Sequence, residues 1–213
     1  MDAEAEFYFF RHGQSEANMR PHIVGGRSNH VALTETGREQ AARLGLYIAS
    51  ELPEPDYVHA TPAVRTQQTA RIALTAARLQ KPLRIEDELQ ELDQGMAEGK
   101  PRADIYTPEV FARIEAEGLD FKHEGGQSLR ELGLQGLRWM NDAYSAHTVG
   151  AIVYVFGHGM AIRSLVGNIL GWDHMQVFKA STPNTCMTKI VGTPGAWHVP
   201  IFASNAHSKT VTN

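Results

Sequence analysis

The sequence predicts an α/β fold: one domain over residues 1–213, a three-layer α/β/α arrangement with a mostly parallel sheet, and a small cap inserted at about 96–127. Two observations carry this prediction. Continuous apolar runs at 7–10 and 151–156 are typical of strands that are covered on both faces. Segments with helical spacing alternate with such strands along the chain, which favours parallel strands with helices on both faces.

The first half of the chain contains three predicted strands and two predicted helices. Apolar residues recur at helical spacing over 34–52, and Pro53 ends that helix. Thr34 or Thr36 can cap its start, and Thr36 with Glu39 has the spacing of a capping box. The predicted elements in order are a strand at 7–10, a helix at 34–52, a strand at 57–60, a helix from Pro62 to before Pro82, and a strand at 83–86.

The second half begins with a segment at 95–127 in which glycine, proline and charged residues replace regular periodicity, as expected for an inserted cap. Regular patterns then resume. The predicted elements are a helix at 128–146, a strand at 151–156, a helix at 160–170, and weaker strands at 185–191 and 197–202. The polar tail from about Ser204 is expected to fray.

Composition excludes several classes of protein. The formal net charge is −4 and no lysine-arginine block is present, which argues against a nucleic-acid partner. Cys186 is the one cysteine, so no intrachain disulfide can form, and without a Cys/His cluster of the right spacing no metal site is expected. The acidic start "MDAEAEFYFF" has too short an apolar run for a signal peptide or a membrane span, so a cytoplasmic location is expected.

The two most hydrophobic strands end alike. "FYFFRHG" and "VYVFGHG" each finish with a histidine followed by glycine, at His12 and His158. Ligand sites lie at the carboxyl ends of parallel strands, so neighbouring strands would make these histidines face one another across one crevice. Glycine lets the backbone approach a ligand, the helix that starts at Met160 favours an anion, and Arg11 can bind phosphate through two parallel hydrogen bonds. The pattern indicates phosphoryl chemistry.

Each of these residues taken alone also has a structural reading. A lone histidine at a strand end is more often a hydrogen-bonded structural group than a nucleophile, and Arg11 alone could be a surface cation. However, an arginine that continues a buried strand is costly to bury without an anionic partner. Two His-Gly pairs together with this arginine therefore favour a functional site over a purely structural role.

Five segments occur in an order that one known family shares. They are "RHGQSEAN", "ALTETGREQA", "ATPAVRTQQTA", "ELQELDQGMAEG" and "VFGHGMAIR". As a set they resemble the histidine phosphatase superfamily, the phosphoglycerate-mutase-like proteins, over residues 6–192.

The resemblance implies a role for each matching residue. His12 matches the nucleophile that becomes phosphohistidine, and His158 matches the second histidine of the phosphate pocket, expected in its protonated form. Glu91 matches the general acid and base. Nearby alternatives to it are Glu88, Asp93 and Glu98. The groups implied to bind the phosphate are Arg11, Asn18, Arg65 and the backbone N–H of Gly159.

The sequence departs from the family pattern at a few positions, none of them at the nucleophile. Asn29 stands where an acid is common, Val31 replaces a proline, Thr61 replaces a serine and Gln127 replaces a glutamate. These departures make the substrates of known family members a weaker guide to the substrate of this chain. Residues that could line the entrance, or simply pack on the main domain, are Tyr106, Phe111, Phe121 and Lys122. Arg27 or Lys100 could serve a second acidic group of the substrate, or be solvated.

The leading hypothesis is a metal-independent phosphatase that hydrolyses a phosphomonoester of a small metabolite through phosphohistidine on His12, without a cofactor. A phosphoglycerate mutase of the same fold is the first alternative, and a catalytically inactive binding or regulatory member is the second. A metal hydrolase that uses His12, His158 and Asp93 is a further alternative. Family members are often dimers, which implies a homodimer.

Overall fold

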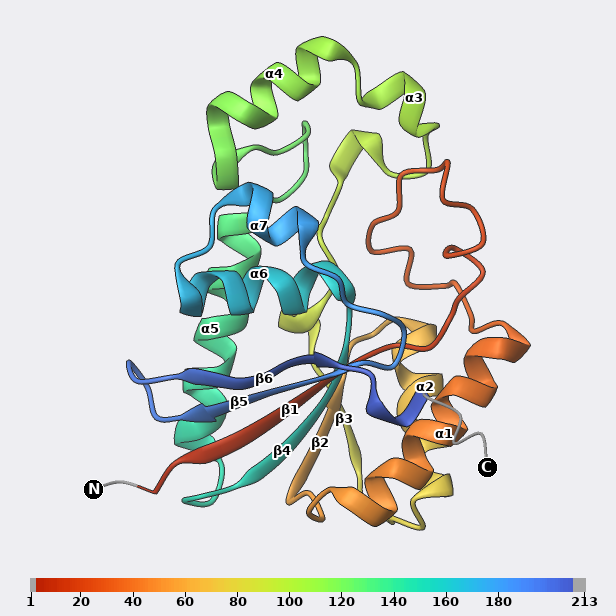
Figure 1. Cartoon of the computed structure of the whole chain (residues 1–213), viewed down its shortest axis with the longest axis vertical. Coiled ribbons are helices and arrows are strands. Elements are labelled where there is room, and N and C mark those ends of the chain that lie inside the picture. Colours follow the sequence, from red (N-terminus) through yellow and green to blue (C-terminus); the bar gives the residue numbers. More distant parts are fainter. Residues whose placement is uncertain (1–2, 209–213) are drawn as a thin grey trace.

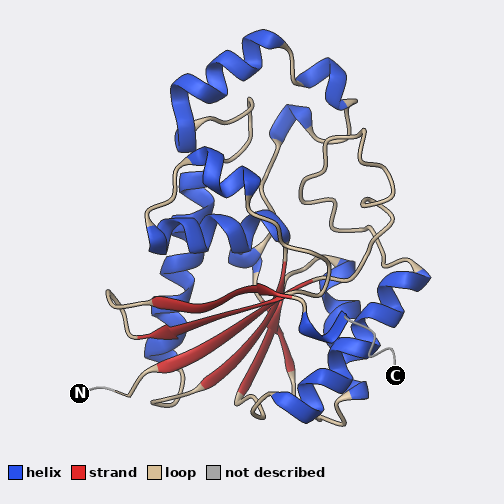
Figure 2. Ribbon diagram, viewed as in Figure 1, coloured by secondary structure: helices blue, strands red, loops and turns tan. Residues whose placement is uncertain are grey.

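The computed structural model describes residues 3–208 and contains a six-stranded sheet with helices on both sides (Figure 1 and Figure 2). The strand order is β3-β2-β4-β1-β5-β6. The strands are β1 (Ala5–Arg11), β2 (Tyr57–Ala60), β3 (Leu83–Ile85), β4 (Ile152–Gly157), β5 (Met187–Gly192) and β6 (His198–Ser204). The predicted α/β fold with its central sheet is confirmed.

The sheet is mostly parallel, with one strand reversed. β3, β2, β4 and β1 pair in parallel, whereas β5 pairs antiparallel with both β1 and β6. A short turn joins β5 to β6, and such a connection can only produce an antiparallel pair. The four parallel strands therefore deliver their carboxyl ends to the same edge of the sheet.

The aromatic run of β1 serves both faces of the sheet. Phe7 and Phe9 pack in one hydrophobic cluster, and Tyr8 and Phe10 pack in the other, as the alternation of side chains along a strand requires. Four helices cover the two faces, with α1 (Glu35–Glu51) and α2 (Val64–Ala76) on the Tyr8 side and α5 (Leu129–Ala146) and α6 (Gly159–Leu170) on the Phe7 side. β1 is thereby fixed from both faces.

Caps define where two of these helices begin. The α1 helix has Thr34 as its N-cap, whose side chain accepts a hydrogen bond from the Gly37 N–H, so the capping box expected from Thr36 and Glu39 is wrong. Thr36 lies inside the first turn, where its backbone is already helical. The α5 helix does begin with a capping box, formed by Ser128 and Glu131.

Residues 96–127, which we call the cap segment, contain short helices that the sequence pattern did not predict. These are α3 (Arg102–Ile105), α4 (Pro108–Glu117) and the 3-10 helix η3 (Gly118–Asp120), and η2 (Gly95–Ala97) precedes them. Figure 1 shows α3 and α4 at the end of the molecule away from the strands. The 3-10 helix η1 (Asp87–Leu89) and the helix α7 (His174–Lys179) were also not predicted, because elements this short leave little periodicity.

The start of the polar tail is ordered, contrary to expectation. A 3-10 helix, η4 (Ala206–Ser208), packs against α1. The His207 Nε2 atom lies 2.9 Å from the Thr185 hydroxyl, and its ring lies against Tyr47. The rest of the tail, 209–213, lies outside the described residues. Over residues 3–208, no helix is long and apolar enough to cross a membrane.

Candidate active site

The carboxyl ends of β1 and β4 bring His12 and His158 together. Arg11 pairs with Gly157 in the parallel register, and the two histidines that follow have ring centroids 5.4 Å apart. Their exposed fractions are only 4% and 0%. The two His-Gly pairs of the sequence therefore meet at one edge of the sheet.

The ring of His12 is held with one nitrogen free to react. Its Nδ1 lies 2.7 Å from the Gly13 carbonyl oxygen, which can only accept, so Nδ1 carries the proton and Nε2 keeps its lone pair. The Gly13 N–H in turn donates to the Thr69 hydroxyl at 3.0 Å. Burial, then the guanidinium groups of Arg65 and Arg11, hold the pKa of His12 well below its usual range. His12 is therefore a neutral imidazole at physiological pH.

A chain of hydrogen bonds fixes the tautomer of His158. An Arg65 N–H, which can only donate, lies 3.2 Å from the His158 Nδ1, so this nitrogen accepts and Nε2 carries the proton. The Nε2 then donates to the Thr61 hydroxyl at 2.9 Å. Thr61 lies 2.8 Å from the Thr66 hydroxyl, which donates to the Ala63 carbonyl at 2.8 Å. Each hydroxyl can thus accept from one neighbour and donate to the next.

His158 is neutral in this arrangement, so the expectation of a protonated His158 is wrong. Burial lowers its pKa well below the usual range, and the charge of Arg65 lowers it further. An imidazolium would also place an Nδ1–H against the N–H of Arg65. The positive charge at this end of the pocket is therefore that of arginine.

Arg65 is buried and Arg11 is half-buried, and apart from the His158 Nδ1 their hydrogen-bond partners are uncharged carbonyls. Arg11 donates to the Thr182 carbonyl at 2.6 Å, and Arg65 donates to the Ser28 and Arg27 carbonyls at 2.9 and 3.0 Å. The Arg11 Nε is buried, and it contacts no acceptor among the described residues. Burying such cations is costly without an anion, so their placement fits the binding of an anionic group.

Asn18 presents its amide group to the same cavity. Its Oδ1 accepts from the Ser15 N–H at 3.0 Å, the Ser15 hydroxyl at 3.2 Å and the Asn184 amide at 3.3 Å. These contacts occupy the oxygen and leave the NH₂ group for a ligand. Asn184 also donates to the His12 carbonyl at 3.0 Å, and sequence reasoning missed it because it follows no recognisable motif.

Glu91 is held at the start of α6. Its carboxylate accepts the N–H groups of Leu92 at 2.9 Å, Ala161 at 3.0 Å and Met160 at 3.1 Å. Two of these bonds reach Oε1 and one reaches Oε2, so Oε2 retains a lone pair. Gly159 instead leaves room for Arg11, because a Cβ there would lie 3.2 Å from the Arg11 Nε.

These residues line one cavity of about 380 Å³ at the sheet edge, within the range of small-molecule sites. The candidate residues in its wall are Arg11, His12, Asn18, Arg65 and Glu91. His158 lies behind them and contacts Arg65.

Comparison with known proteins identifies the family. The model of the histidine phosphatase superfamily (branch 1) matches residues 7–204. The chain belongs to this superfamily. The phosphoglycerate-mutase-like resemblance of the five segments is thus confirmed at the level of the family.

Relatives of this chain carry two kinds of name. The uncharacterized phosphatase PhoE of Bacillus subtilis is 26% identical over 92% of this chain and 93% of its own length. A 2,3-bisphosphoglycerate-dependent phosphoglycerate mutase of Rhizobium meliloti is 31% identical over 73% of this chain and 75% of its own length. The structure of a mycobacterial glucosyl-3-phosphoglycerate phosphatase superposes with a TM-score of 0.81 at 19% identity, covering 94% of this chain and 99% of that one, which shows the shared fold.

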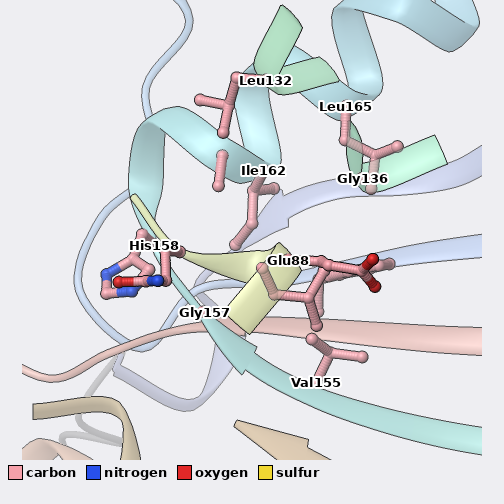
Figure 3. A pocket seen from close by; sticks show the side chains of 12 residues that line it. Glu88, Leu132, Gly136, Val155, Gly157, His158, Ile162 and Leu165 are labelled. Atoms are coloured by element: carbon pink, nitrogen blue, oxygen red, sulfur yellow. The ribbon is translucent and has the colours of Figure 1, made fainter. Parts of the chain in front are cut away.

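The other acidic candidates lie outside the cavity. Figure 3 shows a small apolar pocket beside His158, on the α6 side, in which the Glu88 carboxylate points away from the histidine. Glu98 accepts from the Arg27 and Ser28 N–H groups. Asp93 accepts from the Gly95 N–H and faces Arg27 at 3.4 Å. Glu91 is therefore the carboxylate that the fold brings to the cavity.

The departures from the family pattern lie around the cavity, not in its wall. Asn29 donates to Gln90, next to Glu91, at 2.7 Å, so it ties the loop after β1 to the acidic segment. Gln127 donates to Gln135 at 2.8 Å, at the base of the cap segment. Thr61 is the hydroxyl partner of His158 described above.

The cationic and aromatic residues expected at the entrance lie elsewhere. Tyr106, Phe121 and Lys122 line a separate small pocket under α4, and Phe111 is 57% exposed. Neither Arg27 nor Lys100 lines the cavity. Three arginines that the sequence did not single out line it instead: Arg20, Arg102 and Arg163.

Proposed function

We propose that this chain is a phosphatase that hydrolyses a phosphomonoester of a small metabolite through a phosphohistidine on His12. One observation carries the proposal. The His12 Nε2 has a free lone pair, and His12 lines a cavity whose wall also holds two arginines, the half-buried Arg11 and the buried Arg65.

In the first step, the His12 Nε2 attacks phosphorus in line with the leaving oxygen. The P–N bond forms and the P–O bond to the alcohol breaks. The proton stays on Nδ1, which remains hydrogen-bonded to the Gly13 carbonyl oxygen. Arg11, Arg65 and the Asn18 amide bind the phosphoryl oxygens. The charge of the transition state is thus met by donors that are already in place, which is the largest contribution in this kind of transfer. These arginines supply the positive charge without a metal ion.

Glu91 supplies the proton to the leaving group. In its protonated form, the hydrogen sits on the open lone pair of Oε2 and passes to the departing alkoxide. As a carboxylate, Glu91 then takes a proton from water, whose oxygen attacks phosphorus and breaks the P–N bond. Orthophosphate leaves and His12 returns to its neutral form.

A phosphoglycerate mutase is the second candidate, favoured by the 31% identity to the Rhizobium meliloti mutase. A mutase returns the phosphoryl group from His12 to a bound intermediate and must exclude water at that stage. The phosphatase proposal is supported by PhoE, whose match spans nearly the whole of both chains. A catalytically inactive member would not need the free Nε2 of His12.

Product analysis separates these candidates. We expect the chain to hydrolyse p-nitrophenyl phosphate with chelator present, and to release free phosphate from phosphorylated metabolites. His12→Ala serves as the control for contaminating phosphatase. Rapid conversion of 3-phosphoglycerate to 2-phosphoglycerate, with a trace of bisphosphoglycerate and without free phosphate, would instead establish the mutase.

A further inference from the structure

Glu98 stands at the start of the cap segment, and its carboxylate reaches back to the loop after β1. The Oε2 atom accepts from the Arg27 N–H at 3.1 Å, and the Oε1 atom accepts from the Ser28 N–H at 2.8 Å and from the Ser28 hydroxyl at 2.6 Å. A main-chain bond from the Gly99 N–H to the Val24 carbonyl, at 2.9 Å, holds the two segments together. Both carboxylate oxygens therefore bind one short piece of the loop.

The same piece of main chain binds the guanidinium of Arg65. The Nη1 atom donates to the Ser28 carbonyl at 2.9 Å, and the Nη2 atom donates to the Arg27 carbonyl at 3.0 Å, with the Gly26 carbonyl at 3.5 Å. The N–H and C=O of a trans peptide group point in opposite directions, and the described chain contains no cis peptide bond. The peptide groups between residues 26 and 28 therefore direct their N–H groups at Glu98 and their carbonyls at Arg65.

This arrangement connects a carboxylate to a guanidinium without direct contact between them. A peptide group whose N–H donates to a carboxylate becomes a better acceptor at its carbonyl, so the bonds on its two sides strengthen one another. Burial lowers the pKa of Arg65, and the charges of Glu91 and Glu98 act in the opposite direction. The Nη atoms of Arg65 are bound by carbonyls and by the His158 Nδ1, so the guanidinium keeps its charge for an anion.

The conformation of the loop depends on this carboxylate. Ser28 has a φ of +32°, which is uncommon for a residue other than glycine and persists only where the surrounding contacts fix it. Glu98 supplies two of those contacts, at the N–H and the hydroxyl of Ser28. A Cβ at Gly26 would overlap the Glu98 carboxylate, so glycine at this position allows the close approach.

We propose that Glu98 is a positioning residue for Arg65: its carboxylate fixes the main chain of residues 26–28, whose carbonyls orient the guanidinium toward the phosphoryl group. Glu98 does not line the cavity, so it acts on the substrate through Arg65. The inference rests on the proposed function, in which Arg65 binds phosphoryl oxygens. It adds a connection from the cap segment to the phosphate pocket.

Glu98→Gln tests the carboxylate with little change in volume. The amide nitrogen cannot accept, so one N–H of the loop loses its partner. Calorimetry measures the Kd of orthovanadate, a tetrahedral oxyanion of the same shape as phosphate. We expect this Kd to rise about tenfold or more, and kcat/KM for p-nitrophenyl phosphate to fall by a similar factor.

Asp93→Asn is the matched control for the loss of a nearby charge. The Asp93 carboxylate faces the side chain of Arg27 at 3.4 Å, not the main chain that binds Arg65. Its replacement should leave the Kd of orthovanadate within about twofold of the wild type, because a partly exposed ion pair contributes little. An unchanged Kd in Glu98→Gln, or an equal rise in Asp93→Asn, would overturn the inference.

Gly26→Ala displaces the carboxylate without removing it, and it tests the inference even if Glu98→Gln folds poorly. Gly26 does not have a positive φ, so its backbone accepts alanine, while the added methyl group takes the place of the Glu98 carboxylate. We expect a rise in Kd similar to that of Glu98→Gln. The double variant should bind within about twofold of either single variant, because both changes break the same contact. Losses that multiply would show that the two residues act separately.

A change at Arg65 distinguishes positioning from a general effect on the fold. Arg65→Lys keeps the charge but removes the planar fork that the carbonyls orient. In this background, Glu98→Gln should change the Kd of orthovanadate by less than about threefold. The tenfold rise expected in the wild-type background, if it recurred with lysine at this position, would contradict a role through Arg65.

Vanadate binding also separates this inference from the proposed activity, because it needs no turnover. A chain that binds orthovanadate but hydrolyses no phosphomonoester would refute the proposed function, and the affinities of the variants would still decide the role of Glu98. A wild-type chain that does not bind orthovanadate would refute the inference itself, because Arg65 would then not be an anion-binding group.

Discussion

At the scale of single residues, the site depends on which ring nitrogen of each histidine carries the proton. Gly13 and Arg65 assign opposite tautomers to the two histidines: His12 keeps its proton on Nδ1, whereas His158 keeps it on Nε2. The first arrangement leaves the Nε2 lone pair of His12 free, as the proposed nucleophile requires. The second allows a neutral ring to accept a hydrogen bond from Arg65 and so to orient the guanidinium proposed to bind phosphate.

Thr61 positions His158, and its substitution is the most specific test of this arrangement. Thr61→Val removes the acceptor of a buried N–H, which costs about 1–3 kcal/mol when the group is left unsatisfied. We expect the hydrolysis of p-nitrophenyl phosphate to fall by about tenfold or more, because Arg65 loses its fixed partner. Thr61→Ser keeps the hydroxyl and should retain most of the activity. Equal losses in both variants would contradict the role of the Thr61 hydroxyl as the acceptor for His158.

Some residues of the site could be predicted from the sequence, and others could not. Arg11 and His12 follow directly from the end of an apolar strand. Their partners do not: the hydroxyl of Thr61 and the amide of Asn184 reach the histidines over 97 and 172 residues of chain, respectively. The same limit produced the wrong protonation state of His158, because desolvation and the charge of Arg65 appear only when the chain is folded.

At the scale of elements, the two central strands were predictable and the short helices were not. β1 and β4 have runs of large apolar residues that leave little choice of structure, and their register places both histidines at one edge. The helix α7 has six residues and the 3-10 helices have three each, so packing, not periodicity, decides them.

The start of α1 offers a test in which structure and sequence pattern differ. Thr34→Ala removes the side chain that accepts the Gly37 N–H, so we expect a loss of about 1 kcal/mol in the free energy of unfolding. Thr36→Ala changes an exposed side chain inside the helix and should alter stability by less than about 0.5 kcal/mol. Urea denaturation measures both. A larger loss for Thr36→Ala would favour the capping box that the sequence suggested.

At the scale of the whole molecule, the cavity is assembled from the loop after β1, the acidic segment before the cap and the start of α6. Each contributes cations or the single carboxylate, and no local pattern relates them. The motifs of the sequence therefore identified residues that the fold brings to one cavity, but the sequence suggested Arg27 and Lys100 for its rim, where the fold places Arg20 and Arg102.

The half-buried His147 should make the stability of the molecule depend on pH. Burial, then the charges of His59 and Arg84, lower the pKa of His147 to about 4. The unfolded chain takes up this proton near pH 6.5 and the folded chain near pH 4, so folding loses stability as the pH falls through that window. Comparing Tm at pH 7.5 and pH 5.0 should give a smaller drop for His147→Gln than for the wild type. Equal drops in Tm for the two proteins would show that His147 is not the source of the pH dependence.

The proposed mechanism passes the phosphoryl group through His12, and trapping the phosphorylated intermediate shows whether it does. The measurement is rapid quenching of the enzyme with ³²P-labelled substrate, followed by mapping of the labelled peptide. We expect a phosphoenzyme that is stable to base and labile to acid, located at His12 and absent from His12→Ala. Turnover without a phosphoenzyme, or a label on any other residue, would contradict it.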